Sequence, residues 1–100
     1  METLREIVWD VKALAQFEKI YLYISPFSLQ NAENLKKEII AKIEQVPLHP
    51  EKYPRDKYRK RNKGDFRAFE AHHIRIAYQI TSTHILIVRV RNTYQEPKKY

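Results

Sequence analysis

The sequence contains no cysteine and no long apolar run. Without cysteine the chain forms neither disulfides nor thiolate metal sites, so its composition fits a reducing compartment, and we expect a cytoplasmic protein. The longest uninterrupted apolar stretches are IVW and ILIV, which predicts neither a signal peptide nor a membrane-spanning helix. A length of 100 residues is typical of one domain with its own core, so we expect residues 1–100 to form a single domain.

The adjacent His72 and His73 are unsuited to a metal site. Neighbouring residues of an extended chain point to opposite faces, so the two imidazoles cannot easily bind one ion. A place in a turn explains the pair better, and we expect no metal ion and no cofactor in this protein.

Positive charge is concentrated in the second half of the chain. Residues 1–50 hold six Lys or Arg against seven Asp or Glu, whereas residues 51–100 hold thirteen against five. Seven of the basic residues fall in the stretch PRDKYRKRNKGDFR at residues 54–67, here called the basic stretch: Arg55, Lys57, Arg59, Lys60, Arg61, Lys63 and Arg67. Such asymmetry favours an acidic partner, either nucleic acid or an acidic protein segment, although a solvated connector remains an alternative.

Two amphipathic helices are predicted in the first half, after a short strand at residues 4–9. Asp10 is a suitable N-cap for the first helix, and the residue before Pro26 ends it. Its apolar stripe recurs at spacings of three and four residues and consists of Leu14, Phe17, Tyr21 and Ile24, with Ala13 and Ile20 widening it. Ser28 caps the second helix and Pro47 ends it, with a stripe of Leu29, Ala32, Leu35, Ile39, Ile43 and Val46. The short connection between them predicts antiparallel helices.

Three strands rich in Ile, Val, Phe and Tyr are predicted at residues 66–71, 74–81 and 85–91. Their short connectors favour antiparallel hairpins. The sequence therefore predicts an α+β fold in the order β-α-α-β-β-β, with two antiparallel helices packed on one face of a mainly antiparallel four-stranded sheet.

Alternation along the last strand predicts which of its side chains face the helices. We expect Leu86, Val88 and Val90 to lie beneath the helices, and Ile85, Ile87, Arg89 and Arg91 to lie on the opposite face. In the preceding strand, Arg75 alternates with Ile74 and Ile76, so its side chain would lie on the same face as these two arginines.

The order of these elements, with a basic loop before the last three strands, resembles that of the RelE/ParE superfamily of bacterial toxins. These proteins are the toxic halves of type II toxin–antitoxin pairs. The segments FRAFEAHHIRIAYQI and ILIVRVRNTYQEPKKY carry the closest match. They are similar to a ParE-like subgroup in which an aromatic-Arg strand, an Arg-x-x-Tyr strand and an Arg-Val-Arg strand ending in Gln-Glu-Pro follow one another.

Two activities occur in this superfamily, and the resemblance implies a different site for each. RelE-like members are ribosome-dependent mRNA endoribonucleases, whereas ParE-like members poison DNA gyrase. If the chain is RelE-like, the resemblance implies catalytic roles for three residues. Arg75 in IRIAY matches a phosphate-binding arginine, while Arg91 and Tyr94 in RNTY resemble the first and last residues of an Arg-x-His-Tyr ending.

The ribonuclease pattern is incomplete in this sequence. Phe66 and Ala68 stand where RelE has two lysines, and Thr93 stands where the Arg-x-His-Tyr ending has its histidine. None of these side chains acts as a general acid or base at neutral pH. The departures favour the ParE-like activity, for which no catalytic residue is expected and a charged surface suffices.

The leading hypothesis is therefore a ParE-like toxin that acts on DNA gyrase or a similar target. A cognate antitoxin would neutralise it by folding an acidic, partly disordered segment onto the basic half, and the basic stretch and Arg89 would bind antitoxin or target. A ribosome-bound mRNA endonuclease and a non-toxic, small nucleic-acid-binding relative remain alternatives. The sequence leaves open whether the final QEPKKY is an ordered arm or a frayed tail.

Overall fold

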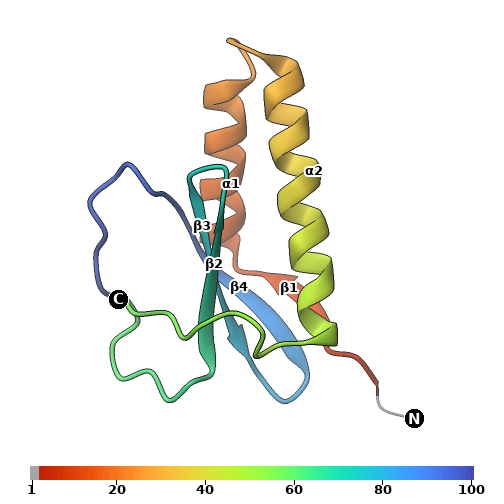
Figure 1. The fold of residues 1–100 in the computed structure, drawn as a ribbon, viewed down its shortest axis with the longest axis vertical. Helices are drawn as coiled ribbons and strands as arrows, with labels where there is room; N and C mark the ends of the chain where they lie inside the picture. Colours follow the sequence, from red (N-terminus) through yellow and green to blue (C-terminus); the bar gives the residue numbers. More distant parts are fainter. Residues whose placement is uncertain (1–2) are drawn as a thin grey trace.

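The computed structural model describes residues 3–100 and contains the predicted elements in the predicted order (Figure 1). Their bounds are β1 Glu6–Trp9, α1 Val11–Ile24, α2 Leu29–Gln45, a 3₁₀ turn Val46–Leu48, β2 Phe66–Ala71, β3 Ile74–Ile80 and β4 His84–Asn92. None of the helices in this part of the chain is long and apolar enough to cross a membrane.

The helix boundaries follow from capping residues that the sequence predicts. The Asp10 carboxylate accepts a hydrogen bond from the backbone N–H of Lys12, and the Ser28 hydroxyl accepts one from the backbone N–H of Asn31. Each bond satisfies a donor that the first helical turn leaves free. α1 ends at Ile24, two residues before Pro26, as predicted.

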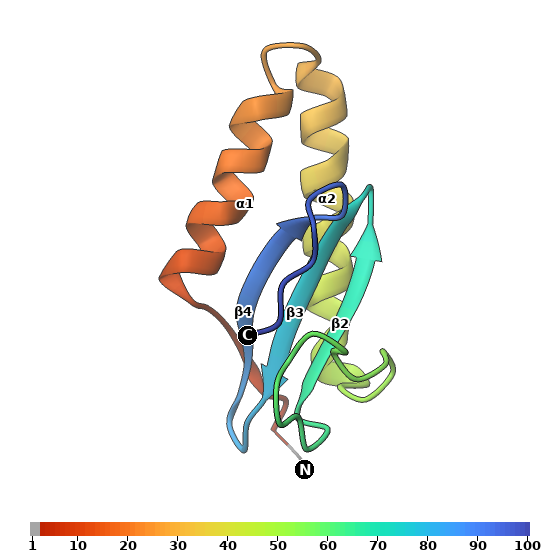
Figure 2. The same ribbon diagram turned by 90° about the vertical axis from the view of Figure 1, so that its left-hand side faces the viewer.

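The four strands form one sheet in the order β1-β4-β3-β2. β1 pairs with β4 in parallel, whereas β4 with β3 and β3 with β2 are antiparallel pairs. The two helices run antiparallel to each other and cover one face of this sheet (Figures 1 and 2). The predicted α+β fold is confirmed.

The core lies between the helices and the sheet. It contains Phe17 of α1, four residues of α2 and the 3₁₀ turn, and the alternating apolar residues of β3 and β4. The predicted stripe on α1 is wrong at Leu14, which is 41% exposed, whereas Ala13, which widens that stripe, is fully buried as expected. Consecutive helical positions differ by about 100° around the axis, so the line that runs through Ala13 and Phe17 leaves Leu14 at its edge.

β4 contains a β-bulge that the sequence analysis did not predict. Ala77 pairs with Arg89 and Tyr78 pairs with Ile87, so Val88 is an extra residue without a partner of its own on β3. Such an insertion reverses the alternation of side chains between the two faces of a strand.

The bulge corrects the predicted assignment of β4 to the two faces. The buried residues of β4 are Ile85, Ile87 and Val90. The prediction that Leu86 and Val88 lie beneath the helices is therefore wrong. Because the phase changes at Val88, the isoleucines face the core while Arg89 and Arg91 remain on the face of the sheet away from the helices, here called the outer face.

The two histidines form the turn between β2 and β3. His72 and His73 both have positive φ angles, 54° and 61°. A two-residue hairpin turn of type I′ requires a positive φ at both of its central residues. His72 also contacts the Glu38 carboxylate, which links the turn to α2. The predicted turn role of this pair is confirmed.

Truncation of a core residue on α2 tests this packing. Leu35 is 5% exposed, so Leu35→Ala should lower the free energy of unfolding by about 2–5 kcal/mol because it leaves a cavity. The neighbouring Lys36 is exposed, and its ammonium group lies 5.6 Å from the ring centre of Tyr21, so Lys36→Ala should change stability little. Thermal or urea unfolding of both variants measures the difference, and equal losses would contradict the helical phase described above.

Candidate functional site

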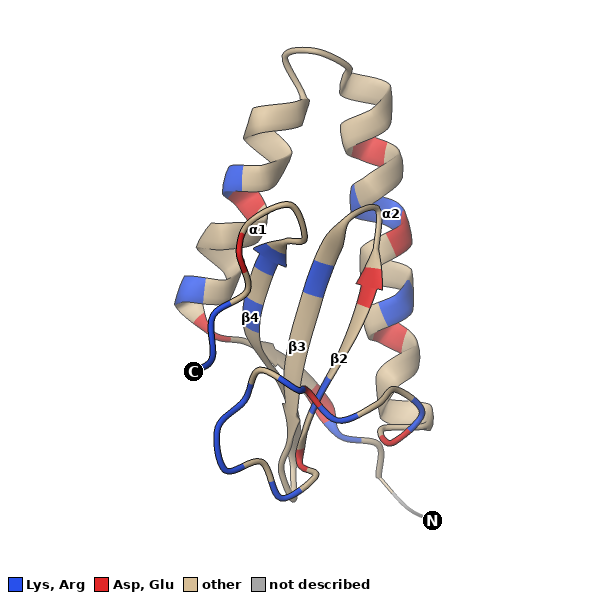
Figure 3. Ribbon diagram, turned by 60° about the vertical axis from the view of Figure 1, so that its left-hand side comes forward, with Lys and Arg blue, Asp and Glu red and all other residues tan. Residues whose placement is uncertain are grey.

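The outer face of the sheet is positively charged. Arg75 from β3 and Arg89 and Arg91 from β4 all project from it, as their spacing predicts. Two segments cross in front of these strands: the basic stretch, and the residues after β4, here called the tail (residues 93–100) (Figure 3).

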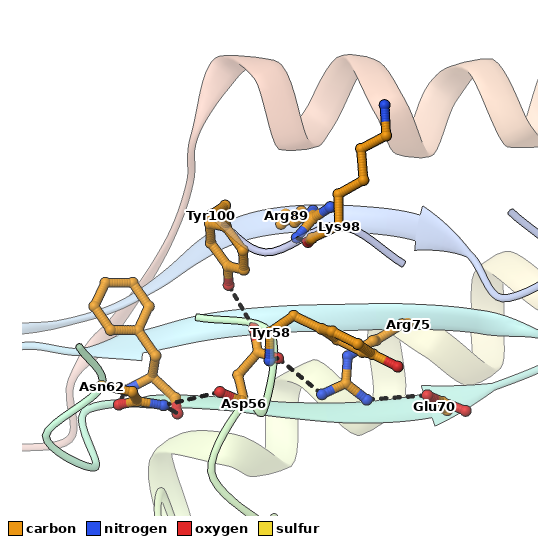
Figure 4. A network of polar contacts seen from close by, with 9 residues as sticks. Asp56, Tyr58, Asn62, Glu70, Arg75, Arg89, Lys98 and Tyr100 are labelled. Atoms are coloured by element: carbon orange, nitrogen blue, oxygen red, sulfur yellow. Dashed lines mark hydrogen bonds and ion pairs between the residues drawn. The ribbon is translucent and has the colours of Figure 1, made fainter. Parts of the chain in front are cut away.

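A buried carboxylate joins these segments to the sheet. Asp56 is 2% exposed, and it is the one charged residue among residues 3–100 that is buried. Its Oδ1 accepts a hydrogen bond from Arg75 Nη2 at 2.8 Å, and its Oδ2 accepts one from the Tyr100 hydroxyl at 2.6 Å (Figure 4). The backbone N–H of Tyr58 donates a third bond to Oδ1 at 3.1 Å. Loop, sheet and tail therefore meet at one side chain.

The environment of Asp56 favours its ionised form. Burial alone would raise the pKa of this carboxyl group, but the hydrogen bonds from Tyr100, Arg75 and the Tyr58 backbone outweigh it, so the pKa is lowered. The same contact raises the pKa of the Tyr100 hydroxyl, through burial and through its bond to the Asp56 carboxylate. Tyr100 is thus a hydrogen-bond donor here and is poorly suited to give up its proton near neutral pH.

The tail is an ordered arm. The backbone N–H of Tyr100 donates to the Tyr58 carbonyl at 2.9 Å, and the backbone N–H of Lys60 donates to the Tyr100 carbonyl at 2.8 Å. The tail also contacts the sheet directly, since Arg89 Nη1 donates to the Lys98 carbonyl at 2.6 Å. The Arg89 guanidinium lies 4.5 Å from the ring centre of Tyr100, within the range of a cation–π contact.

The seven cations of the basic stretch divide into structural and exposed groups. Arg67 is structural, because its guanidinium donates to the backbone carbonyls of Glu51, Tyr53 and Gly64. Arg59 is stacked between two rings, 4.0 Å from Phe66 and 5.0 Å from Tyr100. The exposed residues are Arg55, Lys57, Lys60, Arg61 and Lys63. A solvated connector is therefore a poor description of the whole stretch.

A cavity of about 190 Å³ separates the tail from the outer face. Arg75, Arg89 and Arg91 line it from the sheet, and Pro97 and Lys98 line it from the tail. Asp56 and Glu70 are the acidic residues in its lining. Four cations and two carboxylates leave the cavity with an excess of positive charge.

The structure does not bring Tyr94 together with the arginines. Tyr94 is 76% exposed and stacks on His73 at a ring distance of 4.7 Å, beside the turn that joins β2 to β3. It does not line the cavity that contains Arg75 and Arg91. Phe66 and Ala68 lie buried on β2, with Phe66 beneath Arg59. The tyrosine that does reach the site is Tyr100.

Sequence reasoning missed Asp56 and Tyr100 as site residues. Asp56 carried a usable signal, because one of only two acids among seven cations is a natural partner for a buried arginine. Nothing local marked Tyr100, whose position depends on where the tail crosses the sheet.

The arrangement can bind an anion, but it offers little for acid–base chemistry. Both oxygens of Asp56 already accept hydrogen bonds, and Glu70 pairs with Arg75 Nη1 at 2.9 Å. No histidine lines the cavity, and its one lysine, Lys98, has no general base beside it among the lining residues. Among residues 3–100, no three His, Asp or Glu side chains gather closely enough to hold a metal ion.

Comparisons with known proteins agree with this architecture. Residues 7–97 match the family model of the ParE toxin of type II toxin–antitoxin systems, parDE. This match spans most of the chain, and the protein belongs to the ParE toxin family within the RelE/ParE superfamily.

A solved structure supports the fold assignment. A chain of the chromosomal ParDE toxin–antitoxin system from P. aeruginosa superposes with a TM-score of 0.71, covering 89% of this chain and 96% of that one. The two sequences are 15% identical, so this likeness concerns the fold alone. Among the curated proteins, none matches the chain.

Replacing the central carboxylate tests the site's architecture. Asp56→Asn keeps the shape but leaves Arg75 without its buried partner, so we expect a loss of about 3 kcal/mol in the free energy of unfolding at pH 7. A lowered pKa in the folded state stabilises the protein above the ordinary carboxyl pKa of about 3.9, and this stabilisation disappears as the pH falls through the folded value. The difference between variant and wild type should therefore shrink below about pH 4.

Urea unfolding between pH 3 and pH 7 measures this dependence. Glu96→Gln removes the same charge from an exposed position in the tail and serves as the control. A difference between Asp56→Asn and wild type that stays constant across this range would contradict the assignment.

Proposed function

We propose that this chain is a ParE-like toxin that acts by binding DNA gyrase or a similar target, and that an acidic antitoxin segment neutralises it by covering the outer face and the basic stretch. The observation that carries the proposal is the composition of the outer face. It gathers Arg75, Arg89 and Arg91 around a cavity with an excess of positive charge, while the acids beside them are already paired. Such a surface favours docking over bond cleavage. A cytoplasmic location is part of the same proposal.

Charge supports the choice of an acidic antitoxin. The basic stretch has five exposed cations and is hydrogen-bonded through its backbone to the tail, which adds Lys98 and Lys99. Complementary charge steers association and fixes the register of a partner. An antitoxin segment rich in Asp and Glu would fold onto this surface as it binds.

The second candidate is a RelE-like ribosome-dependent endoribonuclease. One observation favours it: Arg75, to which the resemblance gives a phosphate-binding role, is the cross-strand partner of Arg91 on the outer face. The position of Tyr94 argues against it, because that hydroxyl lies outside the cavity they line. RNA cleavage would then lack the acid or base that the superfamily pattern implies.

Growth arrest in a bacterium separates the two candidates. Under the binding hypothesis, Tyr94→Phe removes one exposed hydroxyl and leaves growth arrest nearly unchanged. The double variant Arg89→Glu, Arg91→Glu reverses the charge of the outer face and should abolish arrest. Lys37→Glu, Lys42→Glu makes the same change of charge on the exposed side of α2 and should still arrest growth.

Each variant must first be shown to fold by circular dichroism. If Tyr94 is catalytic, Tyr94→Phe should instead lower the cleavage rate by about 10²–10⁴-fold with the fold intact. A folded Tyr94→Phe protein that no longer arrests growth would sink the binding hypothesis and favour the ribonuclease.

A further inference from the structure

The cavity between the tail and the outer face has the size of a subsite for one chemical group. Its volume of about 190 Å³ corresponds to about six water molecules at about 30 Å³ each. Pockets that enclose a whole small molecule are larger, at roughly 300–1,000 Å³. Ala77 forms part of its floor and Pro97 part of its roof, so its charged walls are combined with apolar surface.

Hydrogen-bond donors in this cavity exceed the acceptors that the chain provides. Arg75 uses both of its terminal nitrogens on Asp56 and Glu70, but its Nε is buried and has no acceptor among residues 3–100. Arg91 is partly buried, and within that range its guanidinium makes no hydrogen bond or ion pair. Buried donors are normally paired, and an unpaired one destabilises the folded state.

The sheet register also destabilises the folded state. Arg75 and Arg91 are directly opposite each other on β3 and β4, with their side chains on the same face. Like charges in this arrangement destabilise an antiparallel pair. Arg89 responds to the same crowding, since burial and then the charge of Arg91 lower its pKa. A bound anion would relieve the repulsion and accept hydrogen bonds from the Arg91 guanidinium, which lines the cavity.

We propose that this cavity binds a single carboxylate, contributed by an aspartate or glutamate side chain of an acidic polypeptide, and that Arg91 is the residue that holds it. A guanidinium and a carboxylate form two parallel hydrogen bonds in one plane, which a bare positive charge cannot match. The inference rests on the proposed function, in which such a polypeptide is the antitoxin.

The lining favours a polypeptide over a nucleic acid. Asp56 and Glu70 face the same cavity, and they would repel the closely spaced phosphates of a nucleic acid strand. An acidic side chain carries one charge at the end of a flexible stem. It can enter beneath the tail while its own backbone stays outside.

Binding of hexaglutamate to the purified protein tests the proposal. Calorimetry at low salt should show that Arg91→Gln weakens binding about tenfold or more, because a charge-assisted pair of hydrogen bonds is lost. Lys99→Gln removes the same charge from an exposed tail residue outside the cavity, and screening should limit its effect to about threefold. Arg91→Lys keeps the charge without the planar fork and should restore only part of the affinity.

The unfolding temperature of Arg91→Gln distinguishes a ligand-binding arginine from one that only stabilises the fold. Since Arg91→Gln removes a like charge opposite Arg75, its unfolding temperature should equal or exceed that of the wild type while its affinity for hexaglutamate falls. A loss of stability together with affinity would make Arg91 a structural residue and overturn the proposal.

Two further results would overturn it. Equal weakening of hexaglutamate binding by Arg91→Gln and Lys99→Gln would show general attraction without a subsite. A stronger effect of Arg91→Gln on oligothymidylate than on hexaglutamate would make the cavity a phosphate site. Growth arrest by the wild-type protein is measured without hexaglutamate, so a toxin that arrests growth yet binds hexaglutamate independently of Arg91 refutes this inference alone.

Discussion

The hydrogen bonds of the buried Asp56 carboxylate hold the basic stretch and the tail against the outer face of the sheet. Residues 49–65 connect the 3₁₀ turn to β2 without a helix or strand of their own, and connections of this length are uncommon in compact domains. Asp56 orders this connection by binding Arg75 on the sheet and Tyr100 on the tail. Asn62 assists from within the loop, since its side-chain amide donates to the carbonyls of Asp56 and Phe66. One buried charge thus fixes three segments that are distant in sequence.

The β-bulge at Val88 has an equally specific consequence. In a regular strand, Ile85, Ile87, Arg89 and Arg91 would share one face, so either the isoleucines would be exposed or the arginines would be buried. The extra residue shifts the alternation of side chains, so the isoleucines of β4 face the core while its arginines lie on the outer face. β4 therefore contributes both arginines to the positive outer face and isoleucines to the apolar core.

Most of the fold could be predicted from the sequence because local signals agree with one another. Asp10, Ser28 and Pro26 mark the helix ends through their own backbone chemistry, and the three C-terminal strands follow from runs of β-branched and aromatic residues. The bulge could not be predicted, because strict alternation in ILIVRVR fits either phase until β3 fixes the register.

The candidate site was harder to predict than the fold. The grouping of Arg75, Arg89 and Arg91 follows from strand spacing, whereas the contacts of Asp56 and Tyr100 span 44 residues of sequence and depend on tertiary structure. Tyr94 was assigned to the possible catalytic set from a four-residue resemblance. Local sequence could not show that the chain turns away after β4 and brings a different tyrosine to the arginines.

We propose that the outer face is a docking surface and not a site of phosphodiester cleavage. The most direct measurement is the incorporation of labelled thymidine and labelled methionine in a bacterium during the first generation after induction of the wild-type protein. A toxin that docks on DNA gyrase should lower DNA synthesis and cause DNA breaks while protein synthesis continues. An immediate stop in methionine incorporation, accompanied by cleaved mRNA on ribosomes, would contradict it.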